Sequence, residues 1–406
     1  MVNGSWQNVA AATGLLSGDG RPAPTIFARM SALATQTGAI NLGQGFPDTD
    51  GPSELLEAAV TAIRGGANQY PPVRGIPALR AAIAEHQRRH YGLDPDPDTE
   101  VLVTAGATEA LTATIIALCS PGDEVIVLEP FYDSYAAAIE LAGAVRRVVP
   151  LRWPEYRLDA DLLAAAVTDR TRLILINTPH NPTGRVFDTD ELTAVARIAQ
   201  AADVLVVTDE VYEHLVFTPH RHVPLATLDG MADRTITISS AGKTFSVTGW
   251  KIGWLHARAD LVDAVAAVKQ FLTFVNGSPF QPAVASSLLM PDDRFASIAA
   301  DLQARSELLT GGLTAAGFDV RPSDGTYFVI ADAAPLGYSD GMALCLDLPG
   351  LVGVVAVPVQ AFHDDPSRPS SLVRFASCKR PDVIAEAARR LAGLRRADRT
   401  ASARPT

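Results

Sequence analysis

The chain has 406 residues, of which 48% are hydrophobic, and a formal net charge of −11. A chain of this length exceeds the size at which a single hydrophobic core stops growing, so we expect two domains. The negative charge excludes a general electrostatic attraction to nucleic acid or to anionic membranes, although locally basic pockets for small anions are compatible with it.

The cysteines and the ends of the chain carry few signals. Cys119, Cys345 and Cys378 lie far apart without the spacing of metal ligands, so neither a disulfide framework nor a zinc site is predicted. The glycines and prolines of Met1 to Pro24 favour a flexible arm, and this segment lacks the pattern of a secretion signal. Apolar runs elsewhere are interrupted before the ~20 residues of a membrane-spanning helix. We therefore expect a cytoplasmic protein.

The middle of the chain alternates short β-branched runs with longer Ala- and Leu-rich stretches, which is typical of a mostly parallel sheet covered by helices. Helices are expected at Thr108 to Leu118 and at Asp190 to Ala202, the latter preceded by the capping candidates Asp188 and Thr189. The expected strands are Val101 to Thr104, Glu124 to Leu128, Arg172 to Ile176, Val204 to Thr208, Thr235 to Ile238 and Trp250 to His256.

After Pro291 the pattern predicts a smaller α+β domain, which also includes the segment before Gly45. Its expected elements are a helix at Arg294 to Ala316, strands at Tyr327 to Ile330, Val352 to Val357 and Leu372 to Ala376, and a helix at Asp382 to Leu394. The predicted organisation is a flexible arm at 1–24, a small domain at 25–48 and 292–395, a large domain at 49–291 and a flexible tail at 396–406.

Polar clusters follow several of the expected strands. In an open α/β sheet, ligands bind beyond the carboxyl ends of the strands, so these clusters indicate the site. They are Gly106-Ala107-Thr108, Glu129 to Asp133, Asn177 to Gly184, Asp209 to Tyr212, and Ser240 to Lys243.

Lys243 ends one of these clusters, Ser-Ser-Ala-Gly-Lys, among small neighbours that leave room for a bulky cofactor. Such a lysine reacts with an aldehyde only if burial or nearby cations lower the pKa of its amine. An isolated lysine is more often a surface charge. The ending Gly-Lys-Thr also matches the Walker pattern, but Thr237 stands where that pattern requires a glycine, which excludes a nucleotide-binding loop.

In this order, from roughly Phe27 to the last helix, the clusters resemble the class I/II aminotransferases of fold type I, which use pyridoxal 5'-phosphate. Asn41 to Asp48, Asn68 to Tyr70 and Gly249 to Trp254 are similar to the branch of kynurenine, cysteine-conjugate and methionine aminotransferases and of actinobacterial N-succinyldiaminopimelate aminotransferases. The resemblance implies a mostly parallel seven-stranded sheet sandwiched by helices, a large cofactor-binding domain, and a homodimer with shared active sites.

The resemblance also assigns roles around the cofactor ring. Lys243 forms the Schiff base and moves protons, Asp209 pairs with the pyridine nitrogen, and Tyr212 and Asn181 hydrogen-bond the phenolic oxygen. Tyr132 stacks on the ring. Taken alone, Asp209 and Asn181 are also typical of turns and caps, and Tyr132 of a core aromatic.

Phosphate binding requires backbone N–H groups and cationic or hydroxyl donors at the start of a helix. Gly106, Ala107 and Thr108 meet this requirement, although an ordinary strand-to-helix turn has the same pattern. By resemblance, Ser240 and Lys251 are further phosphate ligands, and Tyr70 reaches the phosphate of the neighbouring subunit. Several relatives carry arginine at the position of Lys251, so the charge is kept without the planar fork.

Arg374, within the apolar run Leu372 to Phe375, matches the arginine that binds the substrate α-carboxylate. The alternative is a structural ion pair, because an arginine in an apolar strand requires a partner. Gly45 and Asn181 map to contacts with the same carboxylate, and Phe27 to the pocket entrance. His180 receives no role.

The resemblance implies a ping-pong aminotransferase that acts on amino acids and 2-oxo acids. The leading substrate pair is N-succinyl-2-amino-6-oxopimelate with glutamate, in lysine biosynthesis, because the similarity extends through Glu129 to Tyr135 and Asp209 to Phe217. Kynurenine, methionine or glutamine as donors, and a cysteine-conjugate β-lyase, are the alternatives. A non-catalytic regulator is disfavoured because no basic helix-turn-helix segment precedes Phe27.

Overall fold

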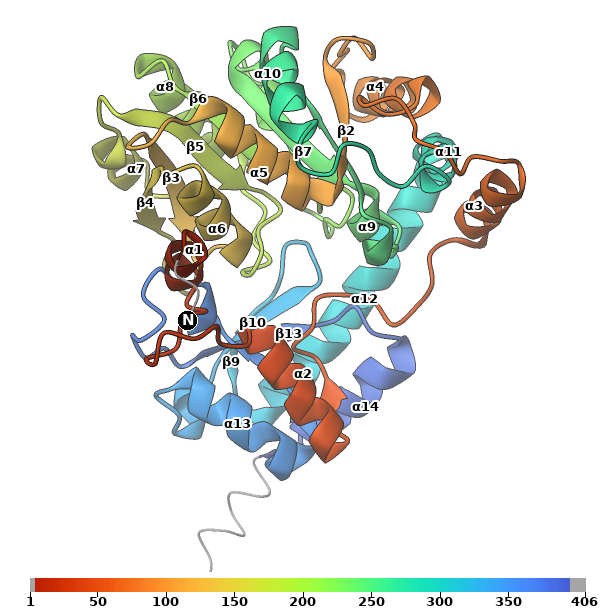
Figure 1. Cartoon of the computed structure of the whole chain (residues 1–406). Helices are drawn as coiled ribbons and strands as arrows, with labels where there is room; N and C mark the ends of the chain where they lie inside the picture. The colour runs from red at the N-terminus through yellow and green to blue at the C-terminus, as the bar shows by residue number, and fades with distance from the viewer. Residues whose placement is uncertain (1–3, 395–406) are drawn as a thin grey trace, which may run out of the picture.

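The computed structural model describes residues 4–394, and a seven-stranded sheet organises its larger part (Figure 1). The strand order is β2-β8-β7-β6-β5-β3-β4, and every neighbouring pair is parallel except those that involve β8. This confirms the mostly parallel seven-stranded sheet. The strands are β2 (Val101–Ala105), β3 (Glu124–Glu129), β4 (Val145–Pro150), β5 (Thr171–Asn177), β6 (Leu205–Asp209), β7 (Thr235–Ser240) and β8 (Ile252–His256).

Both faces of the sheet are buried, as the continuous apolar runs of the central strands require. Along β3, Val125 and Val127 pack in the core on one face, whereas Ile126 and Leu128 pack in the core on the other. The large part contains helices on both faces and at the β2 edge, namely α3 (Ser53–Arg64), α4 (Pro77–Tyr91), α5 (Gly106–Leu118), α6 (Asp133–Leu141), α7 (Ala160–Ala166), α8 (Thr189–Ala201), α9 (Ala241–Thr244), α10 (Ala259–Lys269) and α11 (Phe280–Leu288).

The start of α8 shows how the sequence sets a boundary. The Asp188 side chain accepts a hydrogen bond from the backbone N–H of Glu191 at 2.9 Å, and the Glu191 side chain accepts one from the backbone N–H of Asp188 at 3.0 Å. This capping box satisfies two amides that the helix itself leaves without partners. Asp188 is therefore the N-cap.

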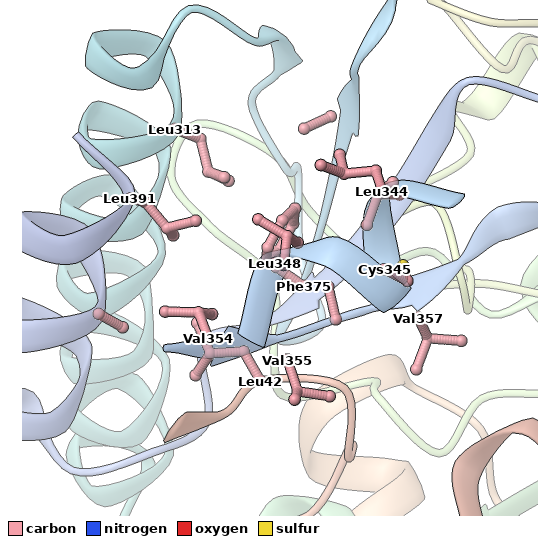
Figure 2. Packing of buried hydrophobic residues seen from close by; sticks show 14 of the residues in the cluster. Leu42, Leu313, Leu344, Cys345, Leu348, Val354, Val355, Val357, Phe375 and Leu391 are labelled. Carbon is pink, nitrogen blue, oxygen red and sulfur yellow. The ribbon is translucent and has the colours of Figure 1, made fainter. Parts of the chain in front are cut away.

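The smaller part, made of the C-terminal residues together with α2 and β1, forms a second core around a four-stranded antiparallel sheet of order β12-β13-β10-β9 and the parallel pair β1-β11. Its elements are α2 (Ile26–Thr37), β1 (Ile40–Asn41), α12 (Asp292–Ala316), β9 (Asp319–Arg321), β10 (Phe328–Asp332), α13 (Gly341–Val352), β11 (Val354–Val355), β12 (Val357–Pro358), β13 (Leu372–Ala376) and α14 (Pro381–Leu391). Figure 2 shows Leu344 and Leu348 of α13 packed with Phe375, Val354 and Val355.

Two segments differ from the expectations, and a third is not described. The strand expected at Val352 to Val357 is divided, because Val352 ends α13, Val354–Val355 pairs with β1, and Val357–Pro358 pairs with β13. The segment expected to be a flexible arm, 1–24, contains the helix α1 (Trp6–Ala12), which packs against α6 and buries Ala10. The expected tail, 396–406, lies outside the described residues. No described helix is both long and apolar enough to cross a bilayer.

Candidate active site

A cavity of about 270 Å³ opens where β2, β5, β6 and β7 end, at the same edge of the large sheet, and faces β10 and β13 of the smaller part. The ends of parallel strands are the expected binding edge of such a sheet. Every predicted site residue except Tyr70 lines this cavity: Phe27, Gly45, Gly106, Ala107, Thr108, Tyr132, Asn181, Asp209, Tyr212, Ser240, Lys243, Lys251 and Arg374.

Lys243 is held by α9, the short helix that follows β7 directly. Its Nζ lies 5.8 Å from the centre of the Tyr212 ring and 5.9 Å from that of Tyr327, so two aromatic rings lie beside the amine. Burial lowers the pKa of the Lys243 amine, and the charge of Asp209 acts in the opposite direction. A larger fraction of the amine is therefore neutral and nucleophilic than for a solvated lysine.

Asp209 ends β6 and is buried in the cavity wall. The Tyr135 hydroxyl donates to its Oδ2 at 2.6 Å, and the backbone N–H of Val211 donates to its Oδ1 at 3.4 Å. Burial raises the pKa of Asp209, whereas the Tyr135 bond lowers it. Among the described side chains, no lysine or arginine forms an ion pair with this carboxylate, so it is available to a cationic ligand.

Asn177 ends β5 directly beside Asp209 in the sheet register, and its side chain stabilises this edge of the sheet by hydrogen bonds. Its Nδ2 donates to the backbone carbonyl of Asp209 at 2.8 Å, and its Oδ1 accepts from the backbone N–H of Asn181 at 2.7 Å. Asn181 is thereby fixed at the rim, where its own Oδ1 accepts from Arg374 at 2.9 Å. Tyr212 is buried opposite, edge-on to Tyr327 with ring centres 5.3 Å apart.

The end of the cavity beside α5 carries the donors for an anion. The N-cap of α5, Ala105, makes no side-chain capping bond. Lys251 Nζ lies 3.5 Å from Thr108 Oγ1, and the backbone of Lys251 is left-handed, with φ 54°. A Cβ on Gly253 would lie 2.5 Å from the backbone of Gly106, so only glycine lets β8 approach the helix start this closely. Uncapped amides, a hydroxyl and an ammonium thus converge here.

Arg374 lies on β13 at the opposite end and is 2% exposed. Its guanidinium carbon lies 4.0 Å, 4.6 Å and 5.4 Å from the ring centres of Phe328, Phe362 and Phe27, respectively. It donates to Asn181 Oδ1 and, at 3.0 Å, to the carbonyl of Gly43, while its buried Nε has no partner. Burial lowers the pKa of Arg374 to about 10, so the group stays charged at neutral pH.

With this geometry in place, comparison with known proteins decides the family. Residues 37–391 match the family of class I and II aminotransferases. The chain belongs to this family. The probable N-succinyldiaminopimelate aminotransferase DapC of Mycobacterium tuberculosis H37Rv is 56% identical to this aminotransferase over 383 residues, which cover 92% of this chain and 96% of the relative. Methionine aminotransferase of Escherichia coli K12 is 40% identical over 370 residues, covering 91% and 96%.

Solved structures agree with the fold-type-I assignment. The structure of N-succinyldiaminopimelate aminotransferase from M. tuberculosis superimposes with a TM-score of 0.90 at 52% identity, covering 97% of this chain and 100% of that one. That of the E. coli methionine aminotransferase gives a TM-score of 0.89 at 40% identity, covering 91% and 97%. The predicted family, fold and enzyme class are confirmed, and the protein is an aminotransferase.

Tyr70 is the one predicted residue outside the cavity of this aminotransferase. Its side chain is 81% exposed and packs edge-on against Phe274 at 5.4 Å between ring centres. Phe271, 87% exposed, and Leu272, 45% exposed, are large apolar side chains in the same connection that follows α10. Tyr70 therefore does not line the cavity of its own chain, and its contact with the phosphate of a neighbouring subunit stays a prediction.

Sequence reasoning assigned no role to Tyr135, Asn177 or Phe328, although Asn177 begins one of the polar clusters that indicated the site. Asn177 carried a usable signal, because it ends a strand next to the one that carries Asp209. Tyr135 and Phe328 did not, since Tyr135 reaches Asp209 from helix α6 and Phe328 covers Arg374 from the neighbouring strand β10, contacts that appear only in the folded chain. His180 is buried, and its Nδ1 lies 2.8 Å from Thr183 Oγ1, in agreement with a residue of loop packing.

Proposed function

We propose that this aminotransferase binds pyridoxal 5'-phosphate in the cavity, with Lys243 as the covalent attachment point. The supporting observation is the distribution of charge: Asp209 at the centre and Arg374 at one end are both buried without an oppositely charged side chain of the described chain paired with them. A protonated pyridine ring would satisfy Asp209, and a substrate carboxylate would satisfy Arg374. The donors at Gly106, Thr108 and Lys251 suit the phosphate.

When bound, pyridoxal phosphate supplies an electron sink for the electrons of the substrate Cα–H bond. Arg374 binds the α-carboxylate with its planar fork, and the rings around it exclude water from that contact. The Lys243 amine removes the proton from Cα as a general base and returns a proton as a general acid. Asp209 would hold the ring nitrogen of the cofactor in its protonated form, and the hydrogen bond from Tyr135 favours the ionised form of Asp209.

For the substrates, we propose N-succinyl-2-amino-6-oxopimelate with glutamate as amino donor, in a ping-pong cycle. The support is the 56% identity to the probable N-succinyldiaminopimelate aminotransferase, against 40% to the methionine enzyme. Initial rates with a panel of donors and acceptors rank the alternatives, which include kynurenine, methionine and glutamine. Inactivity with the succinylated substrate would exclude the proposed pair, and release of pyruvate and ammonia from a cysteine conjugate would indicate β-lyase chemistry.

The attachment point is tested by covalent trapping. Borohydride reduction of the cofactor-loaded protein, followed by digestion and peptide sequencing, should place the label on Lys243. The Lys243→Ala variant should lose the visible cofactor absorbance and at least about 10³-fold in kcat, because the nucleophile and general base are removed together. Lys269→Ala, a change at a buried lysine that donates to backbone carbonyls away from the cavity, is the control. Label on another residue, or unchanged turnover in Lys243→Ala, would refute the assignment.

A further inference from the structure

Three histidines meet outside the active-site cavity, and the aminotransferase chemistry uses none of them. His86 and His90 lie four residues apart on α4, so their side chains project from the same face of that helix. His214 comes from the connection after β6, two residues beyond Tyr212. The ligating nitrogen atoms of the three rings all lie within 4.8 Å of one another.

The closest contact in this cluster joins two imidazole nitrogens. His86 Nε2 lies 2.6 Å from His214 Nε2, and the ring centres of His86, His90 and His214 are separated by 4.6 to 4.9 Å. Two neutral imidazoles can share one proton at such a contact, which leaves the third ring outside that bond. A metal ion in place of the proton would use all three rings at once.

The surroundings suit neutral imidazole ligands. His86 is fully buried, and the Phe295 ring lies 4.3 Å from the centre of the His214 ring and 5.2 Å from that of His90. Burial among aromatic rings disfavours the charged form of an imidazole, and the neutral ring is the form that binds a metal ion. The His90 side chain keeps 15% of its surface exposed, which gives an ion a route from solvent.

Two charged groups border the cluster. Arg89 donates to His90 Nε2 at 3.1 Å, and its positive charge opposes the binding of a cation at that nitrogen. The same arginine also donates to the backbone carbonyls of Leu288 and Met290. The exposed Asp292 carboxylate lies 3.1 Å from Arg89 Nε and 3.8 Å from His90 Nε2, and compensates that charge. An ion would require His90 to change its orientation and Arg89 to release its contact with His90 Nε2, while the Arg89 contacts with Leu288 and Met290 can remain.

We propose that His86, His90 and His214 bind a late first-row divalent metal ion, with Zn²⁺ as the best match. Three imidazoles from one helix and one connection form a typical zinc ligand set, with solvent in the fourth position. At Zn–N distances of about 2.0–2.1 Å, tetrahedral ligand atoms lie roughly 3.4 Å apart, between the 2.6 Å and 4.8 Å separations present here. The ion would join α4 to the connection that carries Tyr212.

The test uses full-length holoenzyme without a polyhistidine tag, dialysed against chelator and kept free of amino acids, which bind metals together with the cofactor. Titration with Co²⁺ should give ligand-field bands of tetrahedral intensity that saturate at one ion per chain, and Zn²⁺ should displace the Co²⁺. Saturation with Zn²⁺ should also raise the melting temperature, because the ion binds only the folded chain.

The decisive variant is His90→Gln, because it removes one ligand and leaves the contact between His86 and His214 in place. It should weaken Co²⁺ binding by at least a hundredfold, more than the roughly 10–100-fold effect of lost outer-shell partners. His220→Gln, a change at a partly exposed histidine outside the cluster, should bind like the wild type. Absence of saturable binding, a spectrum of octahedral water-coordinated Co²⁺ in the wild type, or equal affinity in His90→Gln would overturn the proposal.

Discussion

At the scale of single residues, the site depends on two buried charges whose natural partners arrive with the ligands. Asp209 and Arg374 are each held by neutral groups, a tyrosine hydroxyl for one and an amide and a carbonyl for the other. A buried charge that lacks a counter-charge is unfavourable, so ligands that supply the counter-charge are bound strongly. Mutations of the neutral side chains that contact these charges, Tyr135 and Asn181, should therefore change catalysis more than folding.

Tyr135→Phe should change the pH dependence of the reaction. The Tyr135 hydroxyl donates to ionised Asp209 and lowers its pKa, so its removal raises that pKa further. A carboxylate with a raised pKa is ionised only at higher pH, so the acid limb of the kcat profile should shift to higher pH. The value of kcat near neutral pH should fall about tenfold. Kinetics between pH 5 and 9 measure both effects. Tyr156→Phe, a buried tyrosine away from the cavity, should leave the profile unchanged.

Arg374→Lys should separate charge from geometry. Lysine keeps the positive charge but lacks the planar fork that makes two parallel bonds with a carboxylate. We expect kcat/KM to fall about 10–100-fold for every amino donor, whatever its side chain, since charged hydrogen bonds contribute about 1.5–3 kcal/mol. Arg368→Lys, at an exposed arginine paired with Asp365, is the control. A loss confined to one donor would contradict α-carboxylate binding by Arg374.

At the scale of elements, local sequence signals predicted strands and helix starts well. Asp188 was expected to cap α8, and it does, because its carboxylate reaches an amide three residues on. Helix α13 was not predicted, because Pro349 and Gly350 inside it disfavour a helix. Its residues are also mostly apolar, so the sequence lacks the alternation of polar and apolar faces that indicates a helix. Burial of Leu344 and Leu348 in the second core overrides these local signals.

Asp188→Ala should destabilise the protein without affecting catalysis. Loss of the N-cap should lower the free energy of unfolding by about 1 kcal/mol, because the amide of Glu191 loses its acceptor. Denaturant titration measures the loss, and unchanged kcat and KM would show that the site is intact. Asp190→Ala, inside the same first turn but without the capping bond, is the matched control; an equal loss there would point to the helix dipole instead of the cap.

At the scale of the whole molecule, the position of Tyr70 predicts a homodimer with shared sites. Tyr70 is exposed beside Phe274, together with the large apolar side chains Phe271 and Leu272, and such exposed groups mark interfaces. The site was predictable in its polar members, because strand ends place Asp209, Ser240 and Gly106 along one edge. Of its aromatic enclosure only Phe27 was expected, at the pocket entrance. Phe328 and Phe362 come from other segments of the smaller part, and they reach Arg374 only when that part is folded.

Mixing two inactive variants tests the shared site. In a hybrid dimer of Tyr70→Ala and Lys243→Ala subunits, one of the two sites receives an intact Tyr70 and an intact Lys243. Random exchange of equal amounts should therefore restore about a quarter of the wild-type activity. Activity no greater than the mean of the separate variants would show that Tyr70 does not serve the opposite subunit, and a monomer in analytical ultracentrifugation would exclude the dimer itself.

The enclosure of Arg374 limits how the donor range of this enzyme can be engineered. Phe27, Phe328 and Phe362 are contributed by stretches far apart in the chain, and all three pack around Arg374. Replacing any one of them therefore disturbs the proposed α-carboxylate site, which every amino-acid substrate uses. Libraries that retarget the enzyme should leave that site untouched. Diversity belongs at Phe46, which lines the cavity and keeps 48% of its surface open to solvent, where a new side-chain pocket can be shaped without weakening the common anchor.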